Sequence, residues 1–311
     1  MSISIVVPIY NECENVQNFL DRLLPVIEKI NVQYEVIFVL DPCKDNSEEI
    51  IINNINKNSN LKLIKMSRRF GQPAAILAGI KNCSHEQAVL IDVDLQDPPE
   101  LIQEMYDYAK KGYDTILAER SSKIGENFLR KIIANVGYFL ISKLSDTNIP
   151  MNVGEFRMIS KKIINHIKDL EERDFFLRGA NSYIGFSNKI IKFDREERKK
   201  GITKYNRFTG SLRIGLNGIF SFSTKPLHFI TVISTLSFIL SLSIFIVYLV
   251  LTGLNFFVFK YQFFVIILIL LVSSLIFFSQ GIIAEYIARL VPDIKKRPPY
   301  IIDKKYNFDN K

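Results

Sequence analysis

Short apolar runs alternate with segments of helical periodicity along the first 120 residues of the chain. The apolar runs predict strands over residues 3–8, 35–40, 61–65, 87–91 and 115–118. The periodic segments predict helices over residues 14–30, 47–58, 72–82 and 99–111. Strands that alternate with helices in this way indicate an α/β fold whose mostly parallel sheet is covered on both faces.

The second half of the chain lacks this alternation and consists of a basic segment followed by two uncharged segments. Residues 120–225 are more basic and less regular, and residues 229–251 and 263–284 carry no charged side chain. Each uncharged run is long enough to cross a hydrocarbon core of about 30 Å as a helix. The short connection between the runs predicts a two-helix transmembrane hairpin within residues 226–288.

Basic residues flank this hairpin on both outer sides, whereas the short loop contains only Lys260. Such asymmetry predicts a multi-pass protein of the cell (inner or plasma) membrane with both termini cytoplasmic. Residues 1–225 are then a cytoplasmic domain, with residues 120–225 as its acceptor and juxtamembrane part. Residues 289–311 are expected to form a basic cytoplasmic tail.

Charge and composition limit the classes of partner and of metal ion that the chain is expected to bind. The formal net charge of +8 over 311 residues favours anionic partners such as nucleotides or a membrane surface. The basic residues lack an aromatic stacking platform on a recognisable nucleic-acid module, so we expect no nucleic acid. Cys13, Cys43 and Cys83 stand singly, which fits a reduced compartment. Three scattered histidines are too few for a zinc site, so a metal here would be a hard ion on oxygen ligands.

The segment "LIDVDLQDPPE" contains the clearest candidate for chemistry. Asp92 and Asp94 project to one side of an extended segment at a predicted strand end. An Mg²⁺ or Mn²⁺ ion would offset their repulsion and bridge them to a diphosphate, with Gln96 as a neutral oxygen ligand. The alternative is a helix-capping turn before two prolines, and Asp97 is expected to shape that turn.

Other polar residues follow strands or lie in basic loops. Tyr10, Asn11 and Glu12 could bind a ribose or a base edge, or Asn11 could cap the next helix. Arg68 and Arg69 precede a predicted helix and could bind an anion or form a solvated turn. The run "DREERKKGITKY" could contact lipid headgroups or close on phosphates. Arg120 and Arg130 are further candidates for a phosphate monoester.

Taken in order, several segments of the chain carry a family resemblance. They are "VPIYNE", "SRRFGQPAAILAG", "DVDLQDPPE", "GEFRMIS", "FLRGANSYIGF", "DREERKKGITKY", "FSTKPL" and the apolar hairpin. Over nearly all of residues 2–300 the chain resembles family 2 glycosyltransferases that act on polyprenyl phosphate. It is most similar to bactoprenol glucosyltransferases and more distantly to dolichyl-phosphate mannose synthases.

The resemblance implies a Rossmann-like fold of the kind called GT-A and a metal-dependent, inverting transfer. The donor is a nucleotide-sugar, with UDP-glucose as the default, and the acceptor is polyprenyl (undecaprenyl) phosphate. The product would be a lipid-linked monosaccharide for extracytoplasmic glycan modification. A homo-oligomer is compatible with this resemblance.

The resemblance also assigns roles to individual residues. The implied catalytic residues are Asp94, Glu155 and Arg120. The implied metal ligands are Asp92, Asp94 and Gln96. The implied donor-binding residues are Pro8, Tyr10, Asn11, Glu12, Asp41, Asp92, Val93, Gln96, Arg198 and Lys204. The implied acceptor-phosphate residues are Arg120, Arg130, Arg157 and Arg195.

Two positions depart from the family pattern. Leu40-Asp41-Pro42-Cys43 stands where the family usually has Asp-Asp-Gly-Ser, and Glu155 stands where the bactoprenol branch usually has Asp. The first departure leaves the donor open among UDP-glucose, UDP-N-acetylglucosamine, UDP-galactose and GDP-mannose. Two other functions have weaker support in the sequence. A non-catalytic membrane scaffold is supported only by the altered loop, and a processive synthase is disfavoured because the chain has no tryptophan.

Overall fold

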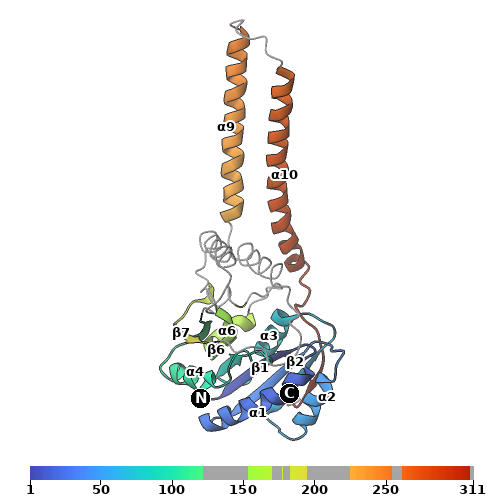
Figure 1. The fold of residues 1–311 in the computed structure, drawn as a ribbon, viewed down its shortest axis with the longest axis vertical. Helices are drawn as coiled ribbons and strands as arrows, with labels where there is room; N and C mark the ends of the chain where they lie inside the picture. Colours follow the sequence, from blue (N-terminus) through green and yellow to red (C-terminus); the bar gives the residue numbers. More distant parts are fainter. Residues whose placement is uncertain (122–152, 170–176, 178–182, 195–224, 254–260, 309–311) are drawn as a thin grey trace.

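The computed structural model describes residues 1–121, 153–169, 177, 183–194, 225–253 and 261–308. Its described strands form an eight-stranded sheet in the order β7-β5-β6-β4-β1-β2-β3-β8 (Figure 1). The strands are β1 (Ile3–Ile9), β2 (Tyr34–Leu40), β3 (Leu61–Met66), β4 (Gln87–Leu90), β5 (Thr115–Arg120), β6 (Val153–Ser160), β7 (Asn188–Phe193) and β8 (Ile302–Tyr306).

The centre of the sheet is parallel. β1 pairs in parallel with β2 and with β4, β2 pairs in parallel with β3, and β5 pairs in parallel with β7. Two strands run the other way: β6 is antiparallel to both β4 and β5, and β8 is antiparallel to β3. The predicted α/β architecture with a mostly parallel sheet is therefore confirmed.

Helices cover both faces of this sheet, as the alternating pattern predicted. They are α1 (Cys13–Ile30), α2 (Ser47–Ile55), α3 (Gln72–Lys81), α4 (Leu101–Lys110) and α6 (Lys161–Asp169). Apolar residues of α1, α2 and α4 form one buried cluster with the sheet, and those of α3 and α6 form a second cluster with its other face. The central parallel strands β1, β2 and β4 are thus buried on two sides, which explains the continuous apolar runs in their sequences.

Three strands were not expected. β6 and β7 lie in the stretch predicted to be irregular, and β8 lies in the predicted tail. The sequence of β8, "IDKKY", is mostly exposed and charged, so its hydrophobic pattern is weak. Its pairing with the edge strand β3 supplies the strand geometry that its local sequence does not indicate.

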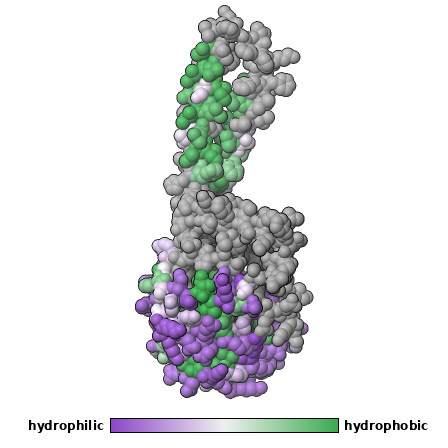
Figure 2. All heavy atoms as spheres, turned by 60° about the vertical axis from the view of Figure 1, so that its left-hand side comes forward, coloured by the Kyte–Doolittle hydropathy of each residue, from purple (hydrophilic) through white to green (hydrophobic). Residues whose placement is uncertain are grey.

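Two long helices extend away from the α/β domain and run side by side, α9 (Lys225–Gly253) and α10 (Tyr261–Ile294) (Figure 1). Their visible surface is largely apolar, in contrast to the mostly hydrophilic surface of the α/β domain (Figure 2). Within the described residues, no helix combines the length and the apolar character required of a membrane span. The predicted transmembrane hairpin is therefore not confirmed.

Candidate active site

Strand direction brings most of the predicted site residues to one edge of the sheet. The carboxyl ends of the parallel strands β1, β2 and β4 meet at this edge. Because β6 runs antiparallel to β4, its first residues reach the same edge. The pairing of Glu119 with Val153 then places the end of β5 beside the start of β6. Residues from five strand ends therefore converge: Tyr10–Glu12, Asp41, Asp92–Gln96, Arg120 and Glu155.

The feature of this edge with the clearest chemistry is a cluster of carboxylates, formed by Asp92, Asp94, Asp97 and Glu155. Burial is the largest cause that raises the pKa of Asp92, followed by the neighbouring charges of Asp97, Asp94 and Glu155, whereas Arg120 lowers it; together they bring this pKa to about 7. A bound cation would offset the repulsion among these carboxylates and favour the ionised form of Asp92. We call Asp92, Asp94, Asp97 and Glu155 the carboxylate cluster below.

The carboxylate cluster fits a metal ion that is shared with a substrate. Among the residues that the structure describes, no group of three or more His, Cys, Asp and Glu side chains is arranged as a complete metal site. Mg²⁺ is commonly held by one or two carboxylates together with substrate phosphates rather than by a full protein cage. Asp92 and Asp94, with the partly exposed amide of Gln96, match that type of site.

Arg120 supplies the positive charge beside the carboxylate cluster. Its side chain is 29% exposed, and its Nη2 lies 3.6 Å from the Oδ1 of Asp97. It also lies directly against Gly154, where an added Cβ would come within 2.7 Å of that nitrogen. The side chain of Arg120 is therefore packed on one side and accessible on the other, as a phosphate-binding arginine needs to be.

Two residues of this edge were not predicted to belong to the site from the sequence. Asp97, which was expected only to shape a turn, is buried and ion-paired with Arg120. Gln72, at the start of α3, donates a hydrogen bond of 2.7 Å from its Nε2 to the Oδ1 of Asp92. The signal available for Asp97 was a third carboxylate within an otherwise apolar strand end, whereas nothing local distinguishes Gln72.

The turn before α3 is fixed to the end of β2 by Asp41. This buried carboxylate accepts hydrogen bonds from the backbone N–H groups of Phe70 (3.0 Å) and Gly71 (2.9 Å). Gly71 has a φ of +93°, which favours glycine. Asp41 thus has a structural task in this turn, and its predicted contact with the donor stays a prediction.

The same turn places Arg69 on Tyr10. The guanidinium carbon lies 4.0 Å from the centre of the tyrosine ring, and Nη1 donates a 3.3 Å hydrogen bond to the hydroxyl oxygen. Both side chains belong to loops at the carboxyl edge of the sheet. This stacked pair offers a flat polar surface and a positive charge, which suits a nucleotide base or a phosphate.

Asn11 joins the first two strand-end loops and does not cap α1, which begins two residues later. It has a φ of 50°; its N–H donates to the Sγ of Cys43 and its Oδ1 accepts from the N–H of Lys44.

Leu95, between the two polar residues Asp94 and Gln96, likewise has a positive φ of 60°. Strained residues in both loops fit a site whose shape is held by its surroundings.

The remaining predicted residues are placed as follows. Pro8 is partly buried within β1, and the Val93 side chain belongs to the apolar core. Glu12 accepts a 2.7 Å hydrogen bond from Asn15. Arg157 is buried, donates to the backbone oxygen of Gly154 at 2.6 Å, and lies 3.7 Å from the carboxylate of Glu155. Four predicted residues lie outside the described part of the chain: Arg130, Arg195, Arg198 and Lys204.

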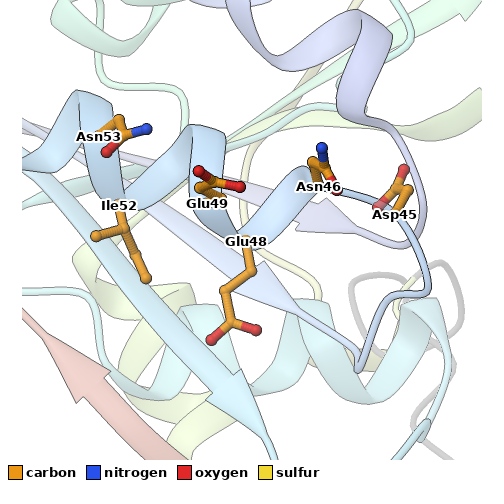
Figure 3. Close-up of a pocket in the computed structure, with 6 residues that line it drawn as sticks. All are labelled: Asp45, Asn46, Glu48, Glu49, Ile52 and Asn53. Atoms are coloured by element: carbon orange, nitrogen blue, oxygen red, sulfur yellow. The ribbon is translucent and has the colours of Figure 1, made fainter.

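A surface pocket of about 350 Å³ lies away from the carboxylate cluster, along the start of α2 (Figure 3). Acidic and amide side chains line it together with Ile52. Two of its carboxylates have structural partners: Glu48 pairs with Lys65 at 2.7 Å, and Asp45 accepts hydrogen bonds from the N–H of Cys13 and the hydroxyl of Ser47. We therefore place the candidate chemistry at the carboxylate cluster and not in this pocket.

Comparisons with known proteins assign the chain to a family. The model of glycosyl transferase family 2 matches residues 4–168. The glycosyltransferase YkcC of Bacillus subtilis is 36% identical over 311 residues, covering 99% of this chain and 95% of that protein. A bactoprenol glucosyl transferase of Shigella phage SfV is 33% identical over 305 residues, covering 97% of this chain and 98% of its own length.

Among solved structures, a mannosyltransferase of Pyrobaculum calidifontis in complex with GDP-Man and Mn²⁺ matches with a TM-score of 0.47 and 16% identity. That match covers 70% of this chain and 63% of the other. The family model and the near full-length relatives agree with each other. The chain therefore belongs to glycosyl transferase family 2, and it is a glycosyltransferase.

Proposed function

We propose that the chain transfers a hexose, by default glucose from UDP-glucose, to the phosphate of a polyprenyl lipid such as undecaprenyl phosphate. The observation that carries this proposal is the carboxylate cluster beside Arg120, which pairs a cation-binding group with a phosphate-binding one. Relatives named bactoprenol glucosyl transferase, 33% identical over nearly their whole length, support the lipid acceptor. The product is a lipid-linked monosaccharide for extracytoplasmic glycan modification.

On the donor side, Asp92, Asp94 and Gln96 would hold Mg²⁺ or Mn²⁺. Such an ion, when bound, stabilises the negative charge that develops on the departing nucleoside diphosphate. Gln72 orients the Asp92 carboxylate through its 2.7 Å hydrogen bond. The stacked pair of Tyr10 and Arg69 offers a surface for the nucleotide.

On the acceptor side, the nucleophile is an oxygen of the lipid phosphate. It attacks the anomeric carbon from the face opposite the diphosphate, a new carbon–oxygen bond forms, and the bond to the diphosphate breaks. The electron pair of that bond leaves with the nucleoside diphosphate, so the anomeric configuration inverts. A phosphate oxygen is already ionised near neutral pH, so the reaction requires no strong general base. Arg120 holds the phosphate in line by charge and hydrogen bonding.

The identity of the sugar and nucleotide is part of the proposal. UDP-N-acetylglucosamine, UDP-galactose and GDP-mannose are the alternative donors, because the Leu40–Cys43 loop differs from the usual family sequence. Cys43 of that loop and the next residue, Lys44, are hydrogen-bonded to Asn11, so the shape of the loop affects the donor side directly.

We also propose that α9 and α10 anchor the enzyme in the cell membrane, with both termini and the α/β domain on the cytoplasmic side. The support is chemical: both uncharged runs lie within these helices, and several of their large apolar side chains are about half exposed or more. Examples are Phe229, Leu236 and Ile239 of α9 and Ile269, Phe277 and Phe278 of α10. An apolar surface of this extent is expected to be covered by lipid.

The anchoring can be tested by fractionating cells that express the full chain. We expect the protein to remain in the membrane pellet after an alkaline carbonate wash, because carbonate removes proteins held only by charge. A protease added to inverted membrane vesicles should cleave the α/β domain, whereas intact spheroplasts should protect it. Release of the chain by carbonate, or cleavage in intact spheroplasts, would contradict the proposed arrangement.

The transfer reaction can be tested with washed membranes that contain the full chain. Undecaprenyl phosphate, Mg²⁺ or Mn²⁺ and each of the four nucleotide-sugars are supplied separately, and the lipid extract is analysed by mass spectrometry. We expect UDP-glucose to give the mass of a polyprenyl phosphate hexose, and to react faster than the other three donors. Nucleotide-sugar binding without any lipid-linked product would favour the non-catalytic scaffold instead.

A further inference from the structure

Asp97 carries a charge in a place where a charge is costly. Its side chain is 1% exposed, at the end of the acidic segment that follows β4. A buried carboxylate is tolerated when an opposite charge compensates it. The Nη2 of Arg120 lies 3.6 Å from its Oδ1, which makes Arg120 an ion-pair partner of this carboxylate.

Gly154 contacts the same guanidinium from another strand. A Cβ added at Gly154 would lie 2.7 Å from the Nη2 of Arg120 and 3.1 Å from its Cζ. A contact of 2.7 Å is shorter than a Cβ atom tolerates, so the guanidinium, at the far end of a flexible side chain, would have to move. Asp97 therefore attracts Arg120 to one position, and the missing side chain at Gly154 leaves the room that this position needs.

The alternative positions for Arg120 are unfavourable for catalysis. Asp92, Asp94 and Glu155 form the rest of the carboxylate cluster, and the charge of Arg120 already lowers the pKa of Asp92. An arginine without its buried partner would be drawn onto these carboxylates. It would then compete with a divalent cation and point away from an incoming phosphate.

We propose that Asp97 and Gly154 are positioning residues that hold the Arg120 guanidinium beside the carboxylate cluster, aimed at the acceptor phosphate. The aim at a lipid phosphate rests on the proposed function, whereas the fixed position of Arg120 does not. Neither residue touches substrate in this arrangement; both act through Arg120.

The first test needs no substrate. The full chain and its Asp97→Asn variant are treated with phenylglyoxal, and the modification rate of Arg120 is followed by mass spectrometry. Losing the charged partner is expected to increase the rate about tenfold, a change typical of coupled charge pairs. An unchanged rate would overturn the proposal, whether or not the enzyme transfers sugar.

Asp114→Asn is the matched control. Asp114 precedes the first residue of the same strand that Arg120 ends, and it accepts hydrogen bonds from Ser187 (2.9 Å) and Ser160 (3.1 Å). The same chemical change there removes a structural carboxylate without touching Arg120. We expect its Arg120 modification rate to equal that of the unaltered chain; an increase equal to that of Asp97→Asn would mean general loosening and would overturn the proposal.

The second test is kinetic and uses lipid acceptor and donor. Asp97→Asn is expected to raise the KM for polyprenyl phosphate about tenfold and to leave the KM for the nucleotide-sugar within about twofold. In the Arg120→Lys background the same substitution should have little further effect, because the residue that it positions is already altered. Additive losses in the double variant would overturn the proposal.

Gly154→Ala keeps every charge and serves if Asp97→Asn fails to fold. Like Asp97→Asn, it is expected to increase the modification rate of Arg120 and the KM for polyprenyl phosphate relative to the unaltered chain, because it displaces the guanidinium sterically. If the unaltered chain yields no lipid-linked product with any donor, the proposed function fails while the modification rates still decide the role of Asp97. Normal rates in Gly154→Ala would overturn its part of the proposal.

Discussion

Replacing Asp94 by alanine is expected to reduce sugar transfer by about 10³-fold or more while the protein stays folded. Asp94 is partly exposed and belongs to the carboxylate cluster, so its removal takes away half of the proposed carboxylate pair for the cation. Within the described residues, its carboxylate accepts a local hydrogen bond from the backbone N–H of Gln96 at 3.2 Å. Its contribution to stability should therefore be small, at about 1 kcal/mol or less.

The measurement is kcat for lipid-linked product at saturating donor, acceptor and metal, together with the thermal unfolding midpoint. Asp21→Ala is the matched control, because Asp21 is an exposed carboxylate on α1 that accepts a hydrogen bond from Gln17. We expect the control to keep its activity. Normal turnover by Asp94→Ala would remove Asp94 from the proposed metal site, and loss of both activity and folding would assign it a structural role.

Removing residues 300–311 is expected to destabilise the α/β domain by about 4 kcal/mol or more. β8 continues the sheet beyond β3, and the N–H of Ser67 donates to the carbonyl of Ile301 at 2.9 Å. Tyr300, Ile302 and Phe308 pack against the same apolar cluster as α3. Their loss exposes an edge strand and part of the core, and it leaves the N–H of Ser67 without its acceptor on Ile301.

The truncation is followed by thermal unfolding in detergent and by the yield of unaggregated protein. Lys304→Ala is the control, since Lys304 lies on β8 with an exposed side chain. We expect a large loss of stability for the truncation and almost none for the substitution. An unaltered unfolding midpoint after truncation would show that β8 adds little to the sheet.

The core of the fold was predictable because its parallel strands and amphipathic helices have clear local patterns. The predicted bounds of β1 to β5 and of the helices between them agree with the structure to within a few residues. β6, β7 and β8 were missed because their places are set by partners distant in sequence. β8, for example, pairs with residues more than 230 positions earlier in the chain.

The candidate site was partly predictable for a similar reason. Parallel strands bring their carboxyl ends to one edge, so Tyr10, Asp41, Asp92 and Asp94 could be placed together from the sequence. The position of Arg120 beside Asp97 depends on the antiparallel insertion of β6 between β4 and β5. No local sequence pattern predicts that insertion, so the sequence indicated only a turn-forming role for Asp97.

The sequence by itself determined the α/β class of this protein, the acidic strand end at Asp92 and Asp94, and the two uncharged runs, because each depends on residues close together in the chain. Only the tertiary structure decided which polar groups contact each other: Gln72 with Asp92, Asp41 with the turn before α3, and Asp97 with Arg120 against Gly154. Such pairings follow from strand order and direction, and these depend on contacts over the whole sheet.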